Sequence, residues 1–463
     1  MIQSINHLAL LPLYTAAATA VLVLVVDLTA GRRSAIFGTA AAGALITAVV
    51  PFRAPAQGTF CLAGAGCSWA PTGSSAVLAA LFAALTLGVL GLSARVPAPP
   101  GEFCLLLTAA MTGGVVVAYA GDLVTLIVGL ETLTLPLYVL TGLRRTTAGA
   151  SSAVTFFLIS VVSTAIALMG AALVFAAAGT LHLAAFTAVP ATPLASVGVS
   201  LVVIGFAFKV AAVPLHAWAP ATYDGAPLPV AAYLSTASKL GGVIALAAIA
   251  SRLDTGPLIA ILAVLTMTVG NLVALRQTGM VRLLAWSSVA QAGYILAPLA
   301  LGAEGTTAAL AYATFFVALE FVAFAVIVAL LPPGAHGGDI ASYRGVARRS
   351  PWPAAAFVLA LSGLAGLPPG LAGLFAKVTI VDTLIDHGWT WLAVIVAVNA
   401  VIALAYYIRT AAILYASPPG LAVADLRLPK LPIHWPVATS TIGAAAVAVA
   451  LGFMPQLLFA ALS

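Results

Sequence analysis

Residues 201–242, LVVIGFAFKVAAVPLHAWAPATYDGAPLPVAAYLSTASKLGG, place two lysines inside long apolar runs. The lysines are Lys209 and Lys239, and Pro214 follows the first by five residues. A lysine at the centre of a bilayer costs about 2.5–3.5 kcal/mol on insertion scales. Ionisable residues at such positions are candidates for function in a membrane protein.

The composition of the whole chain supports this interpretation. Of 463 residues, 63% are hydrophobic and 6% are charged, and the mean hydropathy is +1.17. A soluble domain carries about 25% charged residues. We therefore predict an all-α polytopic membrane protein forming a single membrane domain. Fourteen hydrophobic segments are predicted, at 7–29, 35–52, 74–94, 103–120, 122–143, 151–178, 196–217, 226–251, 256–275, 279–301, 306–332, 352–385, 388–416 and 436–462.

The basic residues predict the orientation of these segments. The net charge of +6 does not indicate nucleic-acid binding, because the basic residues are spread in ones to threes over the joints between segments. One set of alternate joints holds thirteen of them, namely Arg32, Arg33, Arg95, Arg144, Arg145, Arg276, Arg282, Arg344, Arg348, Arg349, Arg409, Arg427 and Lys430. The other set holds Arg53 and Arg252. By the positive-inside rule the first set is cytoplasmic, and both termini lie on the outer side.

The N-terminal region raises two further expectations. The first segment lacks a cationic leader, so we expect a retained span and not a removed signal peptide. Cys61 and Cys67 lie in the outward joint between the second and third segments. Because an outward location permits oxidation without requiring it, a disulfide and two free thiols remain equally open.

Acidic residues complement the buried lysines, which include Lys377. Glu131 lies within LIVGLETLTLPLYVL and Glu320 within FFVALEFVAF. Burial favours the neutral form of a carboxyl or an amine, whereas a nearby opposite charge favours the charged form. A lysine can therefore release its proton when its partner moves, which is the chemistry of a proton relay. The alternatives are snorkelling of the lysines to the interface and static ion pairs that join two helices.

Two segments are interrupted beside these lysines. Pro214 follows Lys209 in IGFAFKVAAVPLHAWAP, and Pro368 and Pro369 precede Lys377 in LSGLAGLPPGLAGLFAKV. Proline removes a helical hydrogen bond, and unwound backbone within a membrane is tolerated where it is buried in protein or lines a hydrated cavity. Paired interruptions indicate inverted repeats with an ion site. The alternative is a pair of proline kinks that serve packing.

Three further polar residues could extend a hydrated path. His216 lies seven residues after Lys209, two turns along the same helix face. Gln291 and Tyr294 lie at mid-span in AWSSVAQAGYIL. Helix packing is an equal alternative for the last two.

Three long stretches resemble the antiporter-like membrane subunits of respiratory complex I. They are GDLVTLIVGLETLTLPLYVLTG, FKVAAVPLHAWAPATYDGAPLPVAAYLSTASKLGG and LSGLAGLPPGLAGLFAKVTIVDTLIDHGW, and the resemblance extends over nearly the whole chain. Within the family, LETLTLPLYVL and a lysine at Lys377 are most similar to the N subunits.

The resemblance implies fourteen spans with two inverted five-helix repeats. Residues 1–102 would form an N-terminal three-helix segment, 103–254 the first repeat, 255–416 the second, and 417–463 a C-terminal loop and last helix. Glu131 would be the coupling carboxylate and Lys209 its paired lysine. Lys239 would be the central relay lysine and Lys377 the outlet lysine. One departure is Gln291, where the family usually has a histidine, because an amide does not carry a proton at physiological pH.

The resemblance implies a proton-translocating subunit of an NADH:quinone oxidoreductase in a bacterial cytoplasmic membrane. No nucleotide, flavin or iron–sulfur motif is evident, so we expect no cofactor and no metal in this chain. NADH, FMN, iron–sulfur clusters and quinone would belong to partner subunits, which are the other membrane subunits, a quinone-binding subunit and the peripheral arm. Three alternatives are a subunit of a cation/proton antiporter, a subunit of a membrane-bound hydrogenase-type complex, and a non-transporting assembly scaffold.

Overall fold

A computed structural model describes residues 5–188, 192–332, 335–417 and 433–462, and most of them are helical. Eleven helical spans in these ranges are long and apolar enough to cross a membrane. Ten of them are α1 (Leu11–Ala30), α2 (Arg33–Val49), α3 (Ser75–Leu92), α4 (Pro100–Tyr119), α5 (Leu123–Gly142), α6 (Thr147–Ala178), α11 (Gly256–Ala274), α13 (Ala303–Leu330), α17 (Thr390–Tyr415) and α18 (Trp435–Phe453). The eleventh joins α9 (Leu228–Tyr233), the π-helical turn η3 (Leu234–Ser238) and α10 (Lys239–Ala250).

Five further helices complete the membrane domain. They are α7 (Pro193–Lys209), α8 (Trp218–Gly225), α12 (Met280–Leu299), α15 (Pro351–Ala365) and α16 (Leu371–Asp386). Counting α7 with α8 and α15 with α16 as interrupted crossings gives fourteen, as predicted. Two boundaries differ by more than a few residues: α8 extends the seventh crossing to Gly225 instead of residue 217, and α18 ends at Phe453 instead of residue 462. The all-α polytopic fold with broken helices is therefore confirmed. Arg427 and Lys430, predicted to lie in a cytoplasmic joint, fall outside the described residues.

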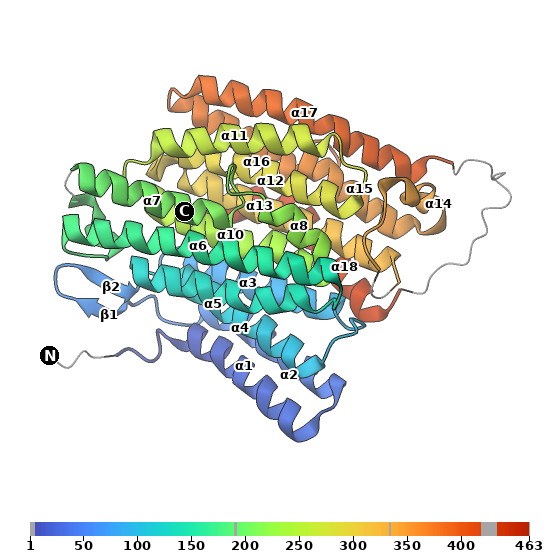
Figure 1. Ribbon diagram of the computed structural model, residues 1–463, viewed down its shortest axis with the longest axis horizontal. Coiled ribbons are helices and arrows are strands. Elements are labelled where there is room, and N and C mark those ends of the chain that lie inside the picture. Colours follow the sequence, from blue (N-terminus) through green and yellow to red (C-terminus); the bar gives the residue numbers. More distant parts are fainter. Residues whose placement is uncertain (1–4, 189–191, 333–334, 418–432, 463) are drawn as a thin grey trace.

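The remaining elements are short. They are the hairpin of β1 (Thr59–Leu62) and β2 (Gly66–Trp69), the 3-10 turns η1 (Val50–Phe52), η2 (Leu183–Ala188) and η4 (Ile340–Tyr343), and the helices α14 (Val346–Arg349) and α19 (Pro455–Leu462). In Figure 1 the hairpin lies at the left end and α14 at the right end, with most long helices running between them. These ends are the two candidate membrane surfaces.

Polar side chains at the joints determine where several helices begin. Asp122 accepts a hydrogen bond from the backbone N–H of Thr125 and so caps α5, at 2.7 Å. Thr146 and Thr192 cap α6 and α7 in the same way. Such caps satisfy backbone donors that the helix itself leaves free.

Burial differs greatly between the central and the peripheral helices. In the most apolar window of each, α13 is 83% buried and the Leu228–Ala250 span 94%, whereas α1 and α18 are 22% buried. The sequence of α13 is apolar all round, as expected for a helix enclosed by others. These two central spans carry Glu320 and Lys239, so both residues lie far from the lipid-facing surface.

Each interruption falls in the fourth crossing of a set of five. The first set runs from α4 to α10 and the second from α11 to α17. An odd number of crossings ends on the other side of the membrane from where it began. The second set of five therefore begins on the side opposite to the first, as inverted repeats require. The helices of the second set follow those of the first across the molecule in Figure 1, and α18 packs on α13 and α3.

The backbone groups freed at the interruptions find partners. Between α7 and α8, Val213 N donates to Thr266 Oγ1 at 2.9 Å, and Trp218 Nε1 donates to the carbonyl oxygen of Phe208 at 3.1 Å. Between α15 and α16, the carbonyls of Leu364 and Ala365 face a lysine described below. Both interruptions are thus enclosed by protein, the condition for unwound backbone at membrane depth.

Candidate functional site

Glu131 and Lys209 form an ion pair between α5 and the last residue of α7. The distance from Lys209 Nζ to Glu131 Oε1 is 2.7 Å. The lysine side chain is 4% exposed and the glutamate side chain 20%. Thr164 of α6 donates a hydrogen bond to the same carboxylate oxygen at 2.6 Å. The sequence predicted both members of this pair, and the structure brings them together.

Hydroxyl groups complete the surroundings of Lys209. Its ammonium also donates to Thr134 Oγ1 and Ser160 Oγ, each at 3.1 Å. Tyr138 donates to the same Ser160 oxygen. An ammonium has three donors, and here all three have acceptors. The protonated form of Lys209 is therefore well accommodated in a buried position.

Lys239 lies at the start of α10, directly after the π-helical turn, and is 1% exposed. Its ammonium donates to the backbone oxygen and to Oγ of Ser288 in α12, and it lies 5.7 Å from the centre of the Phe316 ring in α13. Unlike Lys209, it has no carboxylate within 4 Å among the described residues. Its charge is held by a neutral hydroxyl, a carbonyl and an aromatic ring.

Glu320 lies one helical turn after Phe316 on α13 and is fully buried. Neither carboxyl oxygen has a hydrogen-bond partner within the described ranges. The carboxyl is near enough to interact electrostatically with Lys239 and with Tyr407 of α17. The static ion pair considered for Glu320 is therefore not formed. A buried carboxylate without partners is energetically costly.

Lys377 of α16 reaches the interruption of its own crossing. Its Nζ donates to the backbone oxygens of Leu364 and Ala365 at 2.9 and 2.7 Å, and it lies 5.2 Å from the centre of the Tyr294 ring. Gly366, with φ +83°, ends α15 in a left-handed conformation, and an added Cβ there would lie 2.8 Å from Lys377 Cδ. The break thus supplies both the acceptors for this ammonium and the space for its stem.

Gln291 links this region to α12, α13 and α17. Its Nε2 donates to the backbone oxygen of Leu364 at 2.9 Å and to the hydroxyl of Tyr407 at 3.0 Å. Its Oε1 accepts from the hydroxyl of Tyr312 at 2.6 Å. Tyr407 in turn lies 2.7 Å from Ser287 Oγ. A hydrogen-bonded series therefore runs from Ser287 to the carbonyl shared with Lys377, with a non-titrating amide in its middle.

The other two auxiliary residues have different surroundings. The hydroxyl of Tyr294 accepts from Asn271 Nδ2 at 2.9 Å, within a polar cluster that includes Tyr406. The helical relation expected between His216 and Lys209 does not hold, because residues 210–217 are not helical. The His216 ring instead lies 5.2 Å from that of Trp286, and its Nδ1 has no hydrogen-bond partner among the described residues.

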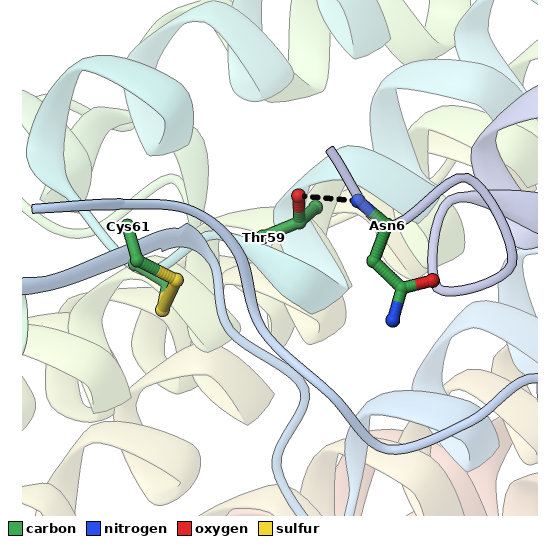
Figure 2. Close-up of a disulfide and its surroundings, with 4 residues drawn as sticks. Asn6, Thr59 and Cys61 are labelled. Atoms are coloured by element: carbon green, nitrogen blue, oxygen red, sulfur yellow. Dashed lines mark hydrogen bonds between the residues drawn. A yellow bond between two sulfur atoms is a disulfide. The ribbon is translucent and has the colours of Figure 1, made fainter. Parts of the chain in front are cut away.

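Cys61 and Cys67 are directly opposite in the hairpin and are joined by a disulfide, as Figure 2 shows. Close by, Asn6 N donates to Thr59 Oγ1 at 3.1 Å, which ties the region before α1 to the hairpin (Figure 2). The indole of Trp69 donates to the backbone oxygen of Ala9 at 3.0 Å. The hairpin is therefore attached to the N-terminal region.

Several residues of the site were not predicted from the sequence. They are Thr134, Ser160, Thr164, Ser287, Ser288, Tyr312 and Tyr407. One available signal was spacing: Ser160 and Thr164 are four residues apart on one helix face, and Ser288, Gln291 and Tyr294 follow at intervals of three.

The arrangement can accept, hold and release protons. Lys209, Lys239, Lys377 and Glu320 are ionisable and buried inside the membrane domain, and Glu131 is partly exposed beside Lys209. Within the described ranges no cluster of three or more His, Cys, Asp or Glu residues is suited to a metal ion. The ionisable residues described above offer acid–base chemistry.

Comparison with known proteins finds relatives that match nearly the whole chain. Residues 120–403 match the family described as NADH:quinone oxidoreductase/Mrp antiporter, TM. NADH-quinone oxidoreductase subunit N of Salinispora tropica is 53% identical, over 99% of this chain and 98% of that protein. A chain of respiratory complex I from Thermus thermophilus is 28% identical with a TM-score of 0.83, covering 97% of this chain and 98% of its own length. A chain of the Mrp complex from Dietzia, 22% identical with a TM-score of 0.85 over 99% of this chain and 96% of its own, shares the fold.

Proposed function

We propose, from the premise that this chain belongs to the NADH:quinone oxidoreductase/Mrp antiporter family of membrane subunits, that its buried glutamate and lysines relay protons across the membrane. The chain is an antiporter-like, proton-translocating membrane subunit of the subunit N type of respiratory complex I. One observation carries the assignment of roles to residues. Three lysines are buried in one domain, and each is held by a different kind of acceptor: a carboxylate, a serine or a broken helix end.

The first step of the proposed relay is a change in the Glu131–Lys209 pair. A charge that approaches or leaves in a neighbouring subunit alters the attraction between carboxylate and ammonium. Glu131 is the more exposed member, so it is the group that such a charge would reach. Weakening of the pair lowers the proton affinity of the buried lysine, because burial alone favours its neutral form.

The later steps carry the proton through Lys239 and out past Lys377. Lys239 receives it in the centre, with Ser288 and Glu320 as nearby polar groups. Lys377 holds it at the broken helix end before release. Moving one charge against the membrane potential costs about 2.3 kcal/mol per 100 mV, which lies within the range that changes of partner and burial produce at buried lysines.

Redox chemistry is assigned to partner subunits. The chain supplies the proton path, whereas NADH, FMN, iron–sulfur clusters and quinone would bind to other subunits of the same complex. The neighbours in the membrane would be other antiporter-like and small subunits. The assembly as a whole, and not this chain alone, is then the enzyme.

We also propose the repeat boundaries 103–254 and 255–416 and a bacterial cytoplasmic membrane with both termini outside. Two observations on the hairpin end support this orientation. Arg53, one of the two basic residues in the poorly charged set of joints, lies just before the hairpin, and the hairpin carries the disulfide. An outer location permits such a bond. Labelling of Cys61 and Cys67 in intact cells by a membrane-impermeant maleimide, only after an impermeant reductant, would support it; labelling only in inverted vesicles would contradict it.

Two substitutions of Lys239 in the intact complex test the relay. We expect Lys239→Ala to abolish NADH-driven acidification of inverted membrane vesicles through this subunit while the complex still assembles. Lys239→Arg keeps the charge but cannot release the proton, since arginine stays protonated. We expect it to fail as well. Normal pumping by both variants at normal complex abundance would favour an assembly scaffold, and normal pumping by Lys239→Arg alone would favour a static charge.

A cation/proton antiporter is the second candidate, because the matching family includes Mrp antiporters. The two functions differ in their driving reaction. Proton movement that requires NADH and quinone and is indifferent to Na⁺ supports the first. Proton movement driven by a Na⁺ gradient without NADH supports the second.

A further inference from the structure

A cavity of about 270 Å³ opens at the basic end of the bundle, away from the relay residues. Its walls come from the joints α3–α4, α5–α6 and α8–α9, the end of α13 and the first turn of α18. This is the end opposite to the hairpin (Figure 1). No step proposed above uses these residues.

Three arginines line the cavity: Arg95, Arg144 and Arg145. Arg144 uses Nη1 to donate to the backbone oxygen of Asp224 at 2.9 Å, next to His336 Nδ1 at 3.0 Å. The guanidinium groups of Arg95 and Arg145 make no hydrogen bond or ion pair with the residues that the structure describes. Two guanidinium groups are therefore available to a ligand in the cavity.

The backbone holds one of these arginines in an unusual conformation. Arg145 has φ +52°, in the left-handed region that residues other than glycine rarely adopt. Such conformations persist where the surroundings enforce them, often at binding sites. The joint between α5 and α6 thus orients Arg145 at a conformational cost.

The remaining lining is largely apolar. It includes Leu92, Val328, Leu331 and Val437, together with prolines of the joints. Three arginines would repel an incoming cation, so the cavity is ill suited to proton uptake. A combination of guanidinium groups and apolar walls instead fits an anion with a hydrocarbon part.

The position of α18 places the cavity at the level of lipid headgroups. Trp435, in the first turn of α18, is 72% exposed beside the cavity residue Val437. Tryptophan is enriched where the membrane meets water. Because α18 is a peripheral helix, lipid can reach this edge of the protein from the bilayer.

We propose that this cavity binds the phosphate of an anionic phospholipid, with Arg95 and Arg145 on the phosphate and the first methylene groups against the apolar walls. Basic pockets between membrane helices on the cytoplasmic side suit such headgroups. The charge of the cavity and its opening at headgroup depth favour a lipid over a soluble anion.

Photo-crosslinking of the intact complex in lipid nanodiscs tests the site. The probe is phosphatidylglycerol with a diazirine near the start of one acyl chain, and a matched phosphatidylcholine probe is the comparison. We expect labelling of peptides around residues 92–97 and 328–332, stronger for phosphatidylglycerol. The double variant Arg95→Gln/Arg145→Gln should reduce it by about tenfold or more, since each lost charge-assisted contact is worth about that factor.

A matched control uses two arginines on the same face that do not line the cavity, Arg276→Gln and Arg282→Gln, which should leave the labelling unchanged. Equal labelling by both lipids in the unsubstituted complex would overturn the proposal, and this comparison needs no variant to fold. Loss of labelling in the presence of inorganic phosphate alone would assign the site to a soluble anion. A map showing residues 418–432 or a partner subunit in the cavity would also overturn it.

Discussion

Lys209 and Glu131 are 78 positions apart in the sequence, yet their charged atoms lie 2.7 Å apart, with the lysine almost fully enclosed and the glutamate partly open. Of the two charged groups, only the glutamate is therefore accessible from outside the protein interior. In the proposed relay, a charge in a neighbouring subunit would act on the glutamate and, through the ion pair, on the enclosed lysine.

Replacing Glu131 by Gln should uncouple this subunit. The amide preserves the shape and one acceptor oxygen but removes the charge, which leaves Lys209 with neutral partners only. Removing one member of a buried ion pair typically costs about 3–5 kcal/mol, and its partial exposure reduces the cost here. We expect reduced NADH-driven proton pumping in vesicles, with a modest loss of complex abundance on native gels. Thr164→Val, which removes one hydrogen bond to the same carboxylate, should have a smaller effect; equal effects would contradict a role for the charge itself.

Glu320→Gln should preserve the fold and impair pumping. The carboxyl oxygens have no hydrogen bonds to lose within the described residues, so a neutral isostere leaves the packing intact. Pumping should fall severalfold if Glu320 exchanges protons with Lys239. Glu304→Gln, on the exposed first turn of the same helix, is the control. Unchanged pumping in both variants would remove Glu320 from the relay.

Gly366→Ala should displace Lys377. A methyl group at Gly366 would lie 2.8 Å from the lysine Cδ and would require a left-handed φ of +83°. Gly388 has a similar φ of +78°, but a methyl group there would meet nothing within 4 Å. Both alanine variants carry the backbone strain. A loss of pumping confined to Gly366→Ala would therefore show that displacement of Lys377 causes the loss. Equal losses would indicate strain alone.

Gln291→Leu should destabilise the junction of α12, α13 and α17. The substitution leaves the Tyr312 hydroxyl without its acceptor, whereas the Leu364 carbonyl keeps the hydrogen bond from Lys377. Each unsatisfied buried polar group costs about 1–3 kcal/mol. The temperature of thermal inactivation of the complex should fall, whereas Gln277→Leu, with one hydrogen bond at the end of α11, should change it little. Similar temperatures for both variants would contradict the importance of the network.

The contact between Arg144 and His336 should weaken on acidification. Burial, together with the nearby guanidinium of Arg144, holds the pKa of His336 below its ordinary value, although Asp224 acts in the opposite direction. A depressed pKa means that the folded joint resists protonation. The contact is therefore fully present above the ordinary histidine pKa and is lost as the pH falls through the lower pKa that His336 has in the folded protein.

Hydrogen exchange of residues 335–343 between pH 7.5 and 5.5 measures this effect. After correction for intrinsic rates, protection should fall with pH in the unsubstituted protein and stay level in His336→Gln. The same pH dependence in both would exclude His336 as its source.

The sequence was most informative where a residue is expensive in a membrane. Glu131, Lys209, Lys239 and Lys377 were evident because a charge in an apolar run is costly, and the prolines revealed both interruptions. The residues that hold these charges gave no such signal. Serine, threonine and tyrosine are tolerated in membrane helices for packing alone, so Ser288 could not be distinguished from its neighbours.

Backbone geometry was even less accessible. The acceptors for Lys377 are carbonyl groups, which every residue carries, and only the fold selects those of Leu364 and Ala365. The predicted helical relation between His216 and Lys209 was wrong because helical periodicity holds only within a continuous helix. The stretch around Pro214 that separates them is not helical. The disulfide depended on strand register, which places Cys61 opposite Cys67.

The hydrogen-bond acceptors of Lys377 are backbone carbonyl groups at the end of α15, so they do not depend on which side chains those residues carry. A helix C-terminus carries partial negative charge, and this one points at an ammonium without any carboxylate. The side chains of Leu364 and Ala365 can therefore change without removing these acceptors, whereas a change in the chain path, as expected for Gly366→Ala, would displace the ammonium. In the proposed relay, the proton affinity of Lys377 therefore depends on the geometry of the break between α15 and α16, and a movement of this break would release the proton.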